Sequence, residues 1–173
     1  MGNLKRTIYR PVDQSIYGFP SCLSHEAFPR GFPTGLSHVH TWWDSILDLN
    51  VKANREIEAI TDQDHWGVVD RWDIPTDGKG DCEDYVLLKR QRLAEAGLPR
   101  RAMRVTVVID EENAGHAVLM IRTDRGDFIL DNKRNAILPW SQTGYTYVKR
   151  ESQARTGWAS LGGLSTSTVA SLR

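Results

Sequence analysis

Hydrophobic and polar positions divide the chain into a helical part followed by a strand-rich part. Between residues 41 and 60 the apolar residues recur near a period of 3.6, which predicts helix. Asn50 and Asn54 interrupt this pattern, so either one helix or two could occupy the segment. A second helix is predicted over 81–96, because Asp81 can cap its start and Gly97 and Pro99 close its end.

Strand patterns follow the second helix. Residues 103–110 alternate between apolar and other positions, residues 116–122 form a continuous apolar run, and residues 128–131 follow a turn at 123–126. A fourth strand is predicted around 145–149. Two helices followed by an antiparallel meander indicate an α+β fold in which the helices pack on the sheet.

The length of 173 residues fits one domain, and the sequence contains no internal repeat. We expect a single domain over 1–173. Within it, residues 1–36 are rich in Pro and Gly and predict an irregular arm, residues 37–151 form the core, and residues 152–173 predict a loosely held tail rich in Ser, Thr and Gly.

Charge and hydropathy exclude several classes of partner. Lys plus Arg and Asp plus Glu number 22 each, so the net charge is zero, whereas binding to nucleic acid or to an anionic membrane requires a positive excess. No apolar run approaches the roughly 18 residues of a membrane-spanning helix. The first residues, MGNLKRTIYR, lack the apolar core of a secretory signal, although a chain already freed of its signal would look the same.

Three residues that lie far apart in the sequence are candidates for nucleophilic catalysis. Cys82 falls in the first turn of the second helix, where free N–H groups favour a thiolate. His116 opens a strand, and Asp131 ends the next one. If the hairpin turns at 124–125, residue 118 lies opposite 131, which makes His116 and Asp131 diagonal neighbours on one face. Such a set could supply a nucleophile, a base and a group that orients the base.

Each of these residues also has a structural interpretation. A lone Cys is more often a packed side chain than a nucleophile, His116 could be a buried polar group, and Asp131 could belong to a turn. We expect Gly80, just before the helix, to let a substrate backbone approach. Six basic residues in and after the second helix are expected to form a solvated surface: Lys89, Arg90, Arg92, Arg100, Arg101 and Arg104.

Carboxylates surround the candidate nucleophile. Asp81, Glu83 and Asp84 put three negative charges beside the Cys82 thiol, and like charges raise the pKa of a thiol. A helix dipole worth about half a charge does not offset three carboxylates. A bound hard cation would reverse the local field, and carboxylate oxygens suit calcium, with oxygens from the 62–73 segment available to complete its shell. The alternative is an acidic first turn that binds no metal, and the residues alone leave both open.

Several segments together resemble the bacterial transglutaminase-like cysteine proteinase family. They are Trp66-Gly67, Trp72-Asp73-Ile74-Pro75, Gly80-Asp81-Cys82-Glu83-Asp84-Tyr85, Gly115-His116-Ala117-Val118-Leu119, Ile129-Leu130-Asp131-Asn132, Ile137-Leu138-Pro139-Trp140 and Gly144-Tyr145. The resemblance covers roughly residues 37–151 and implies a papain-like, transglutaminase-type core. It implies a catalytic triad of Cys82, His116 and Asp131 and calcium ligands at Asp81 and Glu83. Asp84 is then expected to act as a capping or structural acid.

The resemblance also implies a setting for the reaction. The best-understood relatives are periplasmic, calcium-dependent proteases that cut the N-terminal module of a large biofilm adhesin beside small residues. An inner-membrane cyclic-di-GMP receptor restrains them. We therefore expect a periplasmic thiol protease with a protein substrate, with Trp66 and Trp72 lining its cleft and the backbone N–H of Cys82 as an oxyanion donor. The triad does not by itself separate a protease from an acyl transferase or amidase, and a non-catalytic binding module of the same fold is a third possibility.

Overall fold

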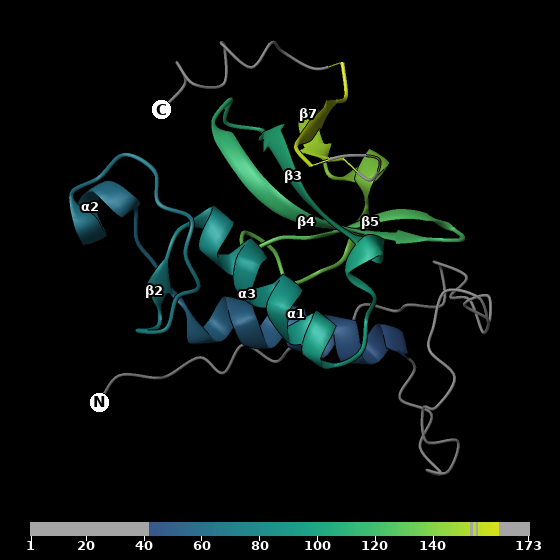
Figure 1. Cartoon of the computed structure of the whole chain (residues 1–173), viewed down its shortest axis with the longest axis horizontal. Helices are drawn as coiled ribbons and strands as arrows, with labels where there is room; N and C mark the ends of the chain where they lie inside the picture. The colour runs from purple at the N-terminus through teal and green to yellow at the C-terminus, as the bar shows by residue number, and fades with distance from the viewer. Residues whose placement is uncertain (1–41, 153, 155, 163–173) are drawn as a thin grey trace, which may run out of the picture.

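The computed structural model describes residues 42–152, 154 and 156–162 (Figure 1). The expected arm over 1–36 and residues 163–173 of the expected tail lie outside these described residues. The helices are α1 (Trp42–Glu56), α2 (Asp62–Trp66) and α3 (Cys82–Glu95), with 3-10 turns η2 (Arg100–Ala102) and η3 (Trp140–Gln142). The strands are β1 (Glu58–Ala59), β2 (Lys79–Gly80), β3 (Met103–Ile109), β4 (Gly115–Thr123), β5 (Gly126–Leu130), β6 (Leu138–Pro139), β7 (Thr146–Glu151) and β8 (Trp158–Ser160).

The α+β fold predicted from the sequence is confirmed, and the predicted helices and strands occur in the predicted order. The first segment is one helix that ends at Glu56, earlier than the pattern suggested, and Asn50 and Asn54 do not break it. The elements α2, β1, β2, β6 and β8 are additions. Strand β8 lies within the segment expected to be a loose tail, where Arg150 and Ala159 form one of its pairs with β7.

Six strands form one antiparallel sheet in the order β6-β5-β4-β3-β7-β8. In the β4–β5 hairpin, Leu119 pairs with Leu130, so residue 118 lies opposite residue 131 as predicted. Gly126 at the turn has a φ of +122°, a backbone conformation that residues other than glycine rarely adopt. The predicted register of this hairpin is confirmed.

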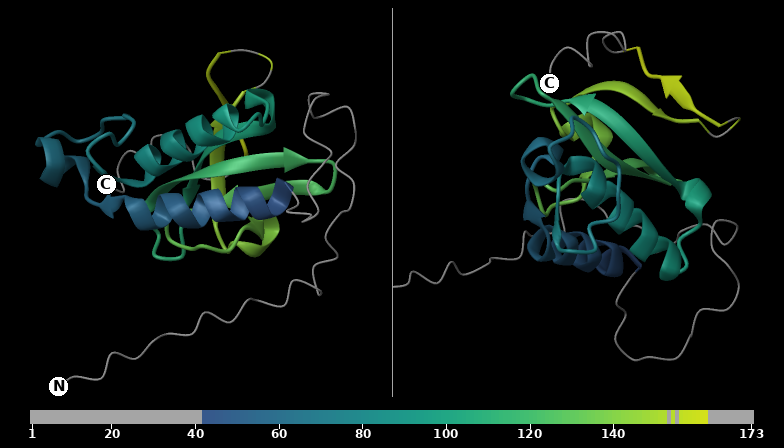
Figure 2. Two further views of the ribbon diagram at one scale, coloured as in Figure 1. Left: turned by 90° about the horizontal axis from the view of Figure 1, so that it is seen from below. Right: turned by 60° about the vertical axis from the view of Figure 1, so that its left-hand side comes forward.

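Helices α1 and α3 lie side by side against the sheet and run in opposite directions (Figures 1 and 2). The apolar residues between them and the sheet form the main core. Its buried members are Ile46, Val86, Leu93, Leu98, Met103, Val105, Ala117, Leu119, Ile121 and Leu130. Because α3 is covered by α1 as well as by the sheet, it buries residues around much of its circumference.

A short parallel pair of strands closes the segment that precedes α3. Glu58 pairs with Lys79 and Ala59 pairs with Gly80. The backbone N–H of Ile60 also donates to the carbonyl of Gly80 at 3.1 Å. The chain from 60 to 78, which contains α2, therefore begins and ends beside the N-terminus of α3.

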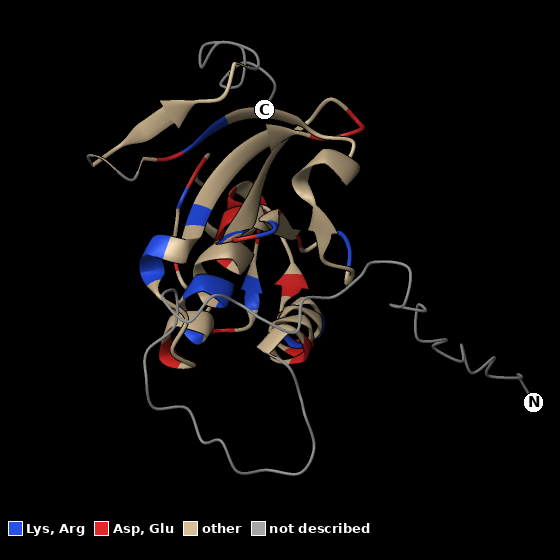
Figure 3. Cartoon of the chain, turned by 90° about the vertical axis from the view of Figure 1, so that its right-hand side faces the viewer, with Lys and Arg blue, Asp and Glu red and all other residues tan. Residues whose placement is uncertain are grey.

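Two of the six basic residues expected to form a solvated surface are buried instead, whereas Arg100 and Arg101 are exposed as expected. The Lys89 side chain is buried, with 1% of the residue exposed, and Arg104 is 5% exposed. Lys89 lies on the part of α3 covered by neighbouring elements, and Arg104 belongs to the central strand β3. Over the part of the chain that the structure describes, acidic and basic residues are interspersed (Figure 3). Among the described residues there is no helix with the length and apolar character needed to cross a membrane.

Candidate active site

His116 and Asp131 meet at the open end of the β4–β5 hairpin. His116 Nε2 lies 2.9 Å from Asp131 Oδ1, and both side chains are almost fully buried. The other carboxylate oxygen accepts a hydrogen bond from the Tyr145 hydroxyl at 2.6 Å, and the Tyr145 ring stands edge-on to the imidazole. The backbone N–H of Lys133 donates to Oδ1 at 3.0 Å. Although burial raises the pKa of Asp131, these hydrogen bonds and the charge of His116 lower it to about 2, so the aspartate is held ionised.

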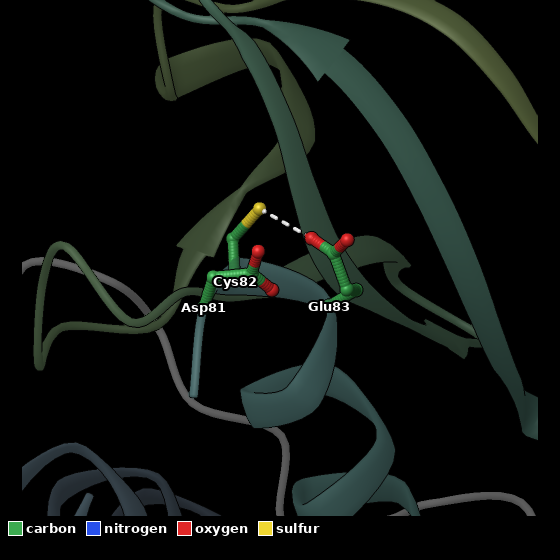
Figure 4. A group of neighbouring side chains, drawn as sticks. All are labelled: Asp81, Cys82 and Glu83. Carbon is green, nitrogen blue, oxygen red and sulfur yellow. Dashed lines mark hydrogen bonds between the residues drawn. The ribbon is translucent and has the colours of Figure 1, made fainter. Parts of the chain in front are cut away.

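The Cys82 thiol comes from the first residue of α3 and points toward the start of β4. The backbone N–H of Ala117, the residue after His116, donates to Sγ at 3.4 Å. The thiol itself donates to Glu83 Oε2 at 3.1 Å (Figure 4). The structure therefore brings Cys82, His116 and Asp131, which come from three separate elements, to one region at the N-terminus of α3.

The environment of the thiol opposes its ionisation. Burial is the largest cause that raises the pKa of Cys82, followed by the charge of Glu83 and the hydrogen bond to it. The Ala117 N–H lowers this pKa, but by less. The net direction is upward, as the sequence predicted from the adjacent carboxylates. A nucleophilic thiolate therefore requires that the negative charge of Glu83 be compensated.

Four carboxylates converge beside Cys82, and a fifth, that of Asp84, groups with two of them. Oxygens of Asp62, Asp70 and Glu83 lie within 4.8 Å of one another, and so do ligand atoms of Asp81, Cys82 and Glu83. A further group within the same limit joins Asp62 to Asp81 and Asp84. The Asp62 carboxylate also accepts a hydrogen bond from the backbone N–H of Arg71. The sequence predicted Asp81 and Glu83 here, and the β1–β2 pair brings Asp62 and Asp70 to them.

The converging carboxylates hold protons more tightly than isolated ones. Burial, a hydrogen bond with Asp70 and the proximity of Asp81 raise the pKa of Glu83 to about 8. Burial and the charges of Asp62 and Asp70 raise the pKa of Asp81, and its Oδ1 is buried with no hydrogen-bond partner in the described part of the chain. Asp81 stands at the N-cap position, yet its side chain makes no capping hydrogen bond, contrary to the sequence prediction. An acidic, oxygen-only donor set with an unpartnered oxygen fits a hard divalent cation.

Asp84 joins the preceding loop to α3 rather than facing the thiol. Its carboxylate accepts hydrogen bonds from the backbone N–H groups of Asp73, at 2.9 Å, and of Asp81. A Cβ placed on Gly80 would lie 2.7 Å from the Cβ of Asp84. The space in front of Gly80, which the sequence suggested for a substrate, is therefore filled by Asp84.

Aromatic side chains flank the acidic segment. Trp66 stacks on His65 with 4.0 Å between ring centroids, and the Arg71 guanidinium lies over the Trp66 ring, 4.4 Å from its centroid. Trp72 meets Trp158 of β8 edge-to-face at 6.3 Å. Both predicted tryptophans are partly exposed, and Trp158 adds a partner that the sequence did not predict.

A family model supplies the decisive comparison. The model of the bacterial transglutaminase-like cysteine proteinases matches residues 24–165, which is most of the chain. The chain belongs to this family. It is therefore a cysteine protease with a transglutaminase-like fold.

Solved structures of one bacterial protein are similar to this chain. LapG of Legionella pneumophila matches with 27% identity and a TM-score of 0.59, covering 73% of this chain and 72% of that one. Calcium-bound LapG matches with 25% identity and a TM-score of 0.58, covering 72% and 75%. EGTA-treated LapG has the same fold and matches with 24% identity and a TM-score of 0.58, covering 75% of this chain and 75% of that one. No curated protein matches this chain in sequence.

Several residues of the site were missed by sequence reasoning. Tyr145 completes the environment of Asp131, and Asn54 Nδ2 donates to the Asp131 carbonyl at 2.9 Å. Asp62 and Asp70 were recognised only as part of an acidic segment. In the sequence, each of these residues is only a polar side chain within a segment of another pattern. The sequence does not show which distant residue it contacts.

Proposed function

We propose that Cys82, His116 and Asp131 form the catalytic triad of this protease. The observation that carries the proposal is the 2.9 Å contact between His116 Nε2 and Asp131 Oδ1, with the Cys82 sulfur at the backbone of the neighbouring Ala117. Asp131 holds Nε2, so Nδ1 is the imidazole nitrogen left to take the thiol proton. This assigns nucleophile, base and orienting group to three side chains of one region.

The reaction is peptide hydrolysis through an acyl-enzyme. The Cys82 sulfur attacks the peptide carbonyl carbon while His116 accepts the thiol proton, and the backbone N–H of Cys82 stabilises the oxyanion. His116 then protonates the leaving amine as the peptide C–N bond breaks. Water releases the acyl group by the same base catalysis. Asp131 remains ionised throughout and stabilises the imidazolium.

Calcium is the cation that we propose for the acidic cluster, held by Asp81 and Glu83 with Asp62 and Asp70. When bound, it neutralises the carboxylates beside the thiol. Glu83 is then occupied as a ligand, and the Cys82 proton is available to His116 instead. The carboxylate set and the calcium-bound form of the similar LapG support this assignment.

The substrate that we propose is a periplasmic or surface protein, such as an adhesin, cut beside small residues. The family resemblance supports this class of substrate, as it does an inner-membrane cyclic-di-GMP receptor as regulator. The exposed Trp66 and the Trp72–Trp158 pair offer an aromatic surface beside the acidic segment, which we assign to substrate contact.

The test is alkylation of the full chain by iodoacetamide in calcium, with mass spectrometry of each cysteine. The sequence contains one other cysteine, Cys22, which serves as the internal reference. Cys82 should react much faster than Cys22, and both H116A and EGTA should remove the difference. A peptide containing Ala-Ala-Gly represents the small-residue site that the family resemblance implies, and its cleavage should be lost in C82A. Equal slow labelling of both cysteines would contradict the triad, and incorporation of an amine in place of hydrolysis would identify an acyl transferase.

A further inference from the structure

Lys89 is a buried cation for which the proposed reaction has no role. It lies on α3 about two turns after Cys82, which places both residues on the same side of the helix. Only 1% of Lys89 is exposed, and among the described residues its Nζ has no hydrogen-bond partner. The Tyr85 ring lies beside it, with its centroid 5.7 Å from Nζ. A buried ammonium is costly, so its retention requires an explanation.

The position of Lys89 follows from how α1 and α3 pack. The two helices run in opposite directions (Figure 1). At one end the Tyr85 hydroxyl donates to the Ile57 carbonyl at 2.6 Å, and towards the other end Ile46 and Leu93 share a core cluster. Lys89 lies midway between Tyr85 and Leu93, so it comes level with the middle of α1.

The middle of α1 presents two amide side chains with a free oxygen each. Asn50 Nδ2 donates to the Asn135 carbonyl at 3.0 Å, and Asn54 Nδ2 donates to the Asp131 carbonyl at 2.9 Å. The Oδ1 atoms of both are buried and have no hydrogen-bond partner in the described residues. Three unused donors of one ammonium and two unused acceptors therefore occur in the same layer.

The charge of Asp131 also acts on Lys89. Burial lowers the pKa of Lys89 to about 7, and the negative charge of Asp131 opposes this shift. Tyr85 on the same helix is a neutral neighbour, and Asp131, in the loop after β5, is the charged group that acts on the ammonium. The ammonium is therefore close enough to the aspartate for the two charges to attract each other.

We propose that Lys89 is a positioning residue of the active site: its ammonium orders the Asn50 and Asn54 amides that hold the 131–135 loop, and its positive charge attracts the Asp131 carboxylate. The inference rests on the proposed triad, because it acts through Asp131. It predicts that loss of the charge weakens the His116–Asp131 hydrogen bond without loss of the fold.

The first test measures Lys89 itself, in the full chain with calcium, by NMR titration of ¹³C-labelled lysine side chains. Lys89 should titrate well below the ordinary lysine range, and D131N should lower its pKa further, because a favourable negative charge is removed. D127N, which removes a carboxylate from the preceding strand β5, should leave the Lys89 pKa unchanged. A Lys89 that titrates with the exposed lysines, or that ignores D131N, overturns the inference whether or not the triad is correct.

The second test uses K89M and K89Q, which keep the length of the side chain without its charge, with K52M on the exposed face of α1 as control. Both Lys89 variants should keep the near-UV circular dichroism of the folded protein and slow Cys82 alkylation roughly tenfold, which corresponds to one pKa unit. The downfield proton signal of the His116 Nε2–H should weaken in both and persist in K52M. Alkylation at the wild-type rate, or slowing accompanied by loss of the folded spectrum in both variants, overturns the proposal. Equal slow labelling of Cys82 and Cys22 in the wild type instead contradicts the triad.

Discussion

Asp131 is the most tightly held side chain of the site. One carboxylate oxygen contacts His116 and the N–H of Lys133, and the other accepts from Tyr145, so a single ionised rotamer is fixed. Hydrogen bonds to a charged acceptor are stronger than those between neutral groups. The imidazole orientation therefore depends on interactions that the folded protein makes before any substrate binds.

The depressed pKa of Asp131 predicts how stability changes in acid. Its pKa is about 2 in the folded protein against 3.8 in the unfolded chain, so its contribution is present above pH 4 and is lost as the pH falls to 2. The difference corresponds to roughly 2 kcal/mol. The free energy of unfolding of the wild type should therefore decline more steeply between pH 4 and pH 2 than that of D131N, as measured by urea denaturation. Equal slopes would contradict the ionised, hydrogen-bonded state of this aspartate.

At this scale, sequence reasoning succeeded where the interaction is local. His116 and Asp131 belong to one hairpin, and a turn of known position fixes which residues face each other. Lys89 was misread as solvated because α3 is covered by both α1 and the sheet. Which side of a helix is buried depends on the elements that pack on it, and these lie elsewhere in the sequence.

The start of α3 combines the proposed nucleophile, the proposed calcium ligands and a structural acid within four residues. Asp84 uses both its carboxylate and the space in front of Gly80 to fix the helix to the Asp73 backbone. The glycine and the acid act as one unit, because the acid can approach only where the glycine has no side chain.

Replacement of this glycine by alanine should therefore destabilise the whole helix start. In G80A the added carbon would lie 2.5 Å from Asp84 Oδ2, so Asp84 must move and lose its contact with Asp73. We expect a loss of about 1–3 kcal/mol, the usual cost of overpacking, measured as a lower urea midpoint. K79A, on the preceding exposed residue, should change the midpoint little. A G80A variant as stable as K79A would show that Asp84 does not need this space.

The raised pKa values of the acidic cluster predict how calcium stabilises the protein. Glu83 keeps its proton to about pH 8 in the metal-free fold but loses it near 4.5 in the unfolded chain, so metal-free stability falls as the pH rises through this window. Calcium binds the deprotonated form. The gain in melting temperature on adding calcium should therefore grow from pH 5 to pH 8, as measured by differential scanning fluorimetry against EGTA. A gain independent of pH, or absent, would contradict calcium binding at Glu83.

Across the whole molecule, the main core is separate from the acidic cluster that we propose to bind calcium. This chain matches calcium-bound and EGTA-treated LapG with the same TM-score of 0.58, so the transglutaminase-like fold is common to both forms. The main core lies between α1, α3 and the sheet and contains none of the four converging carboxylates. Loss of a cation would therefore change the cluster and the thiol rather than the core.

Sequence patterns predicted the parts of the fold that are long and periodic. The 15-residue helix α1 and the central strands β3 and β4 were recognised, whereas β1, β2 and β8, of two or three residues each, were not. Such short strands have too few residues for a period to emerge. The sequence brought the 62–73 segment to the cation site but did not single out Asp62 and Asp70 within it, because the β1–β2 pair that positions them has no sequence signal.

The short parallel pair β1–β2 leaves the acidic segment as a loop over residues 60–78 that is fixed at both ends. The two ends of that segment are joined at Glu58–Lys79 and Ala59–Gly80, and between them Asp62 and Asp70 lie near the carboxylates at the start of α3, where we propose that calcium binds. When calcium is removed, the middle of this loop should move away from α3 while the β1–β2 pair stays formed. Within residues 42–162, trypsin should then cut first after Arg71 in EGTA, and calcium should protect this bond, as followed by mass spectrometry of early fragments. The same first cut in both conditions would mean that the loop is held against α3 by interactions other than those with a metal ion.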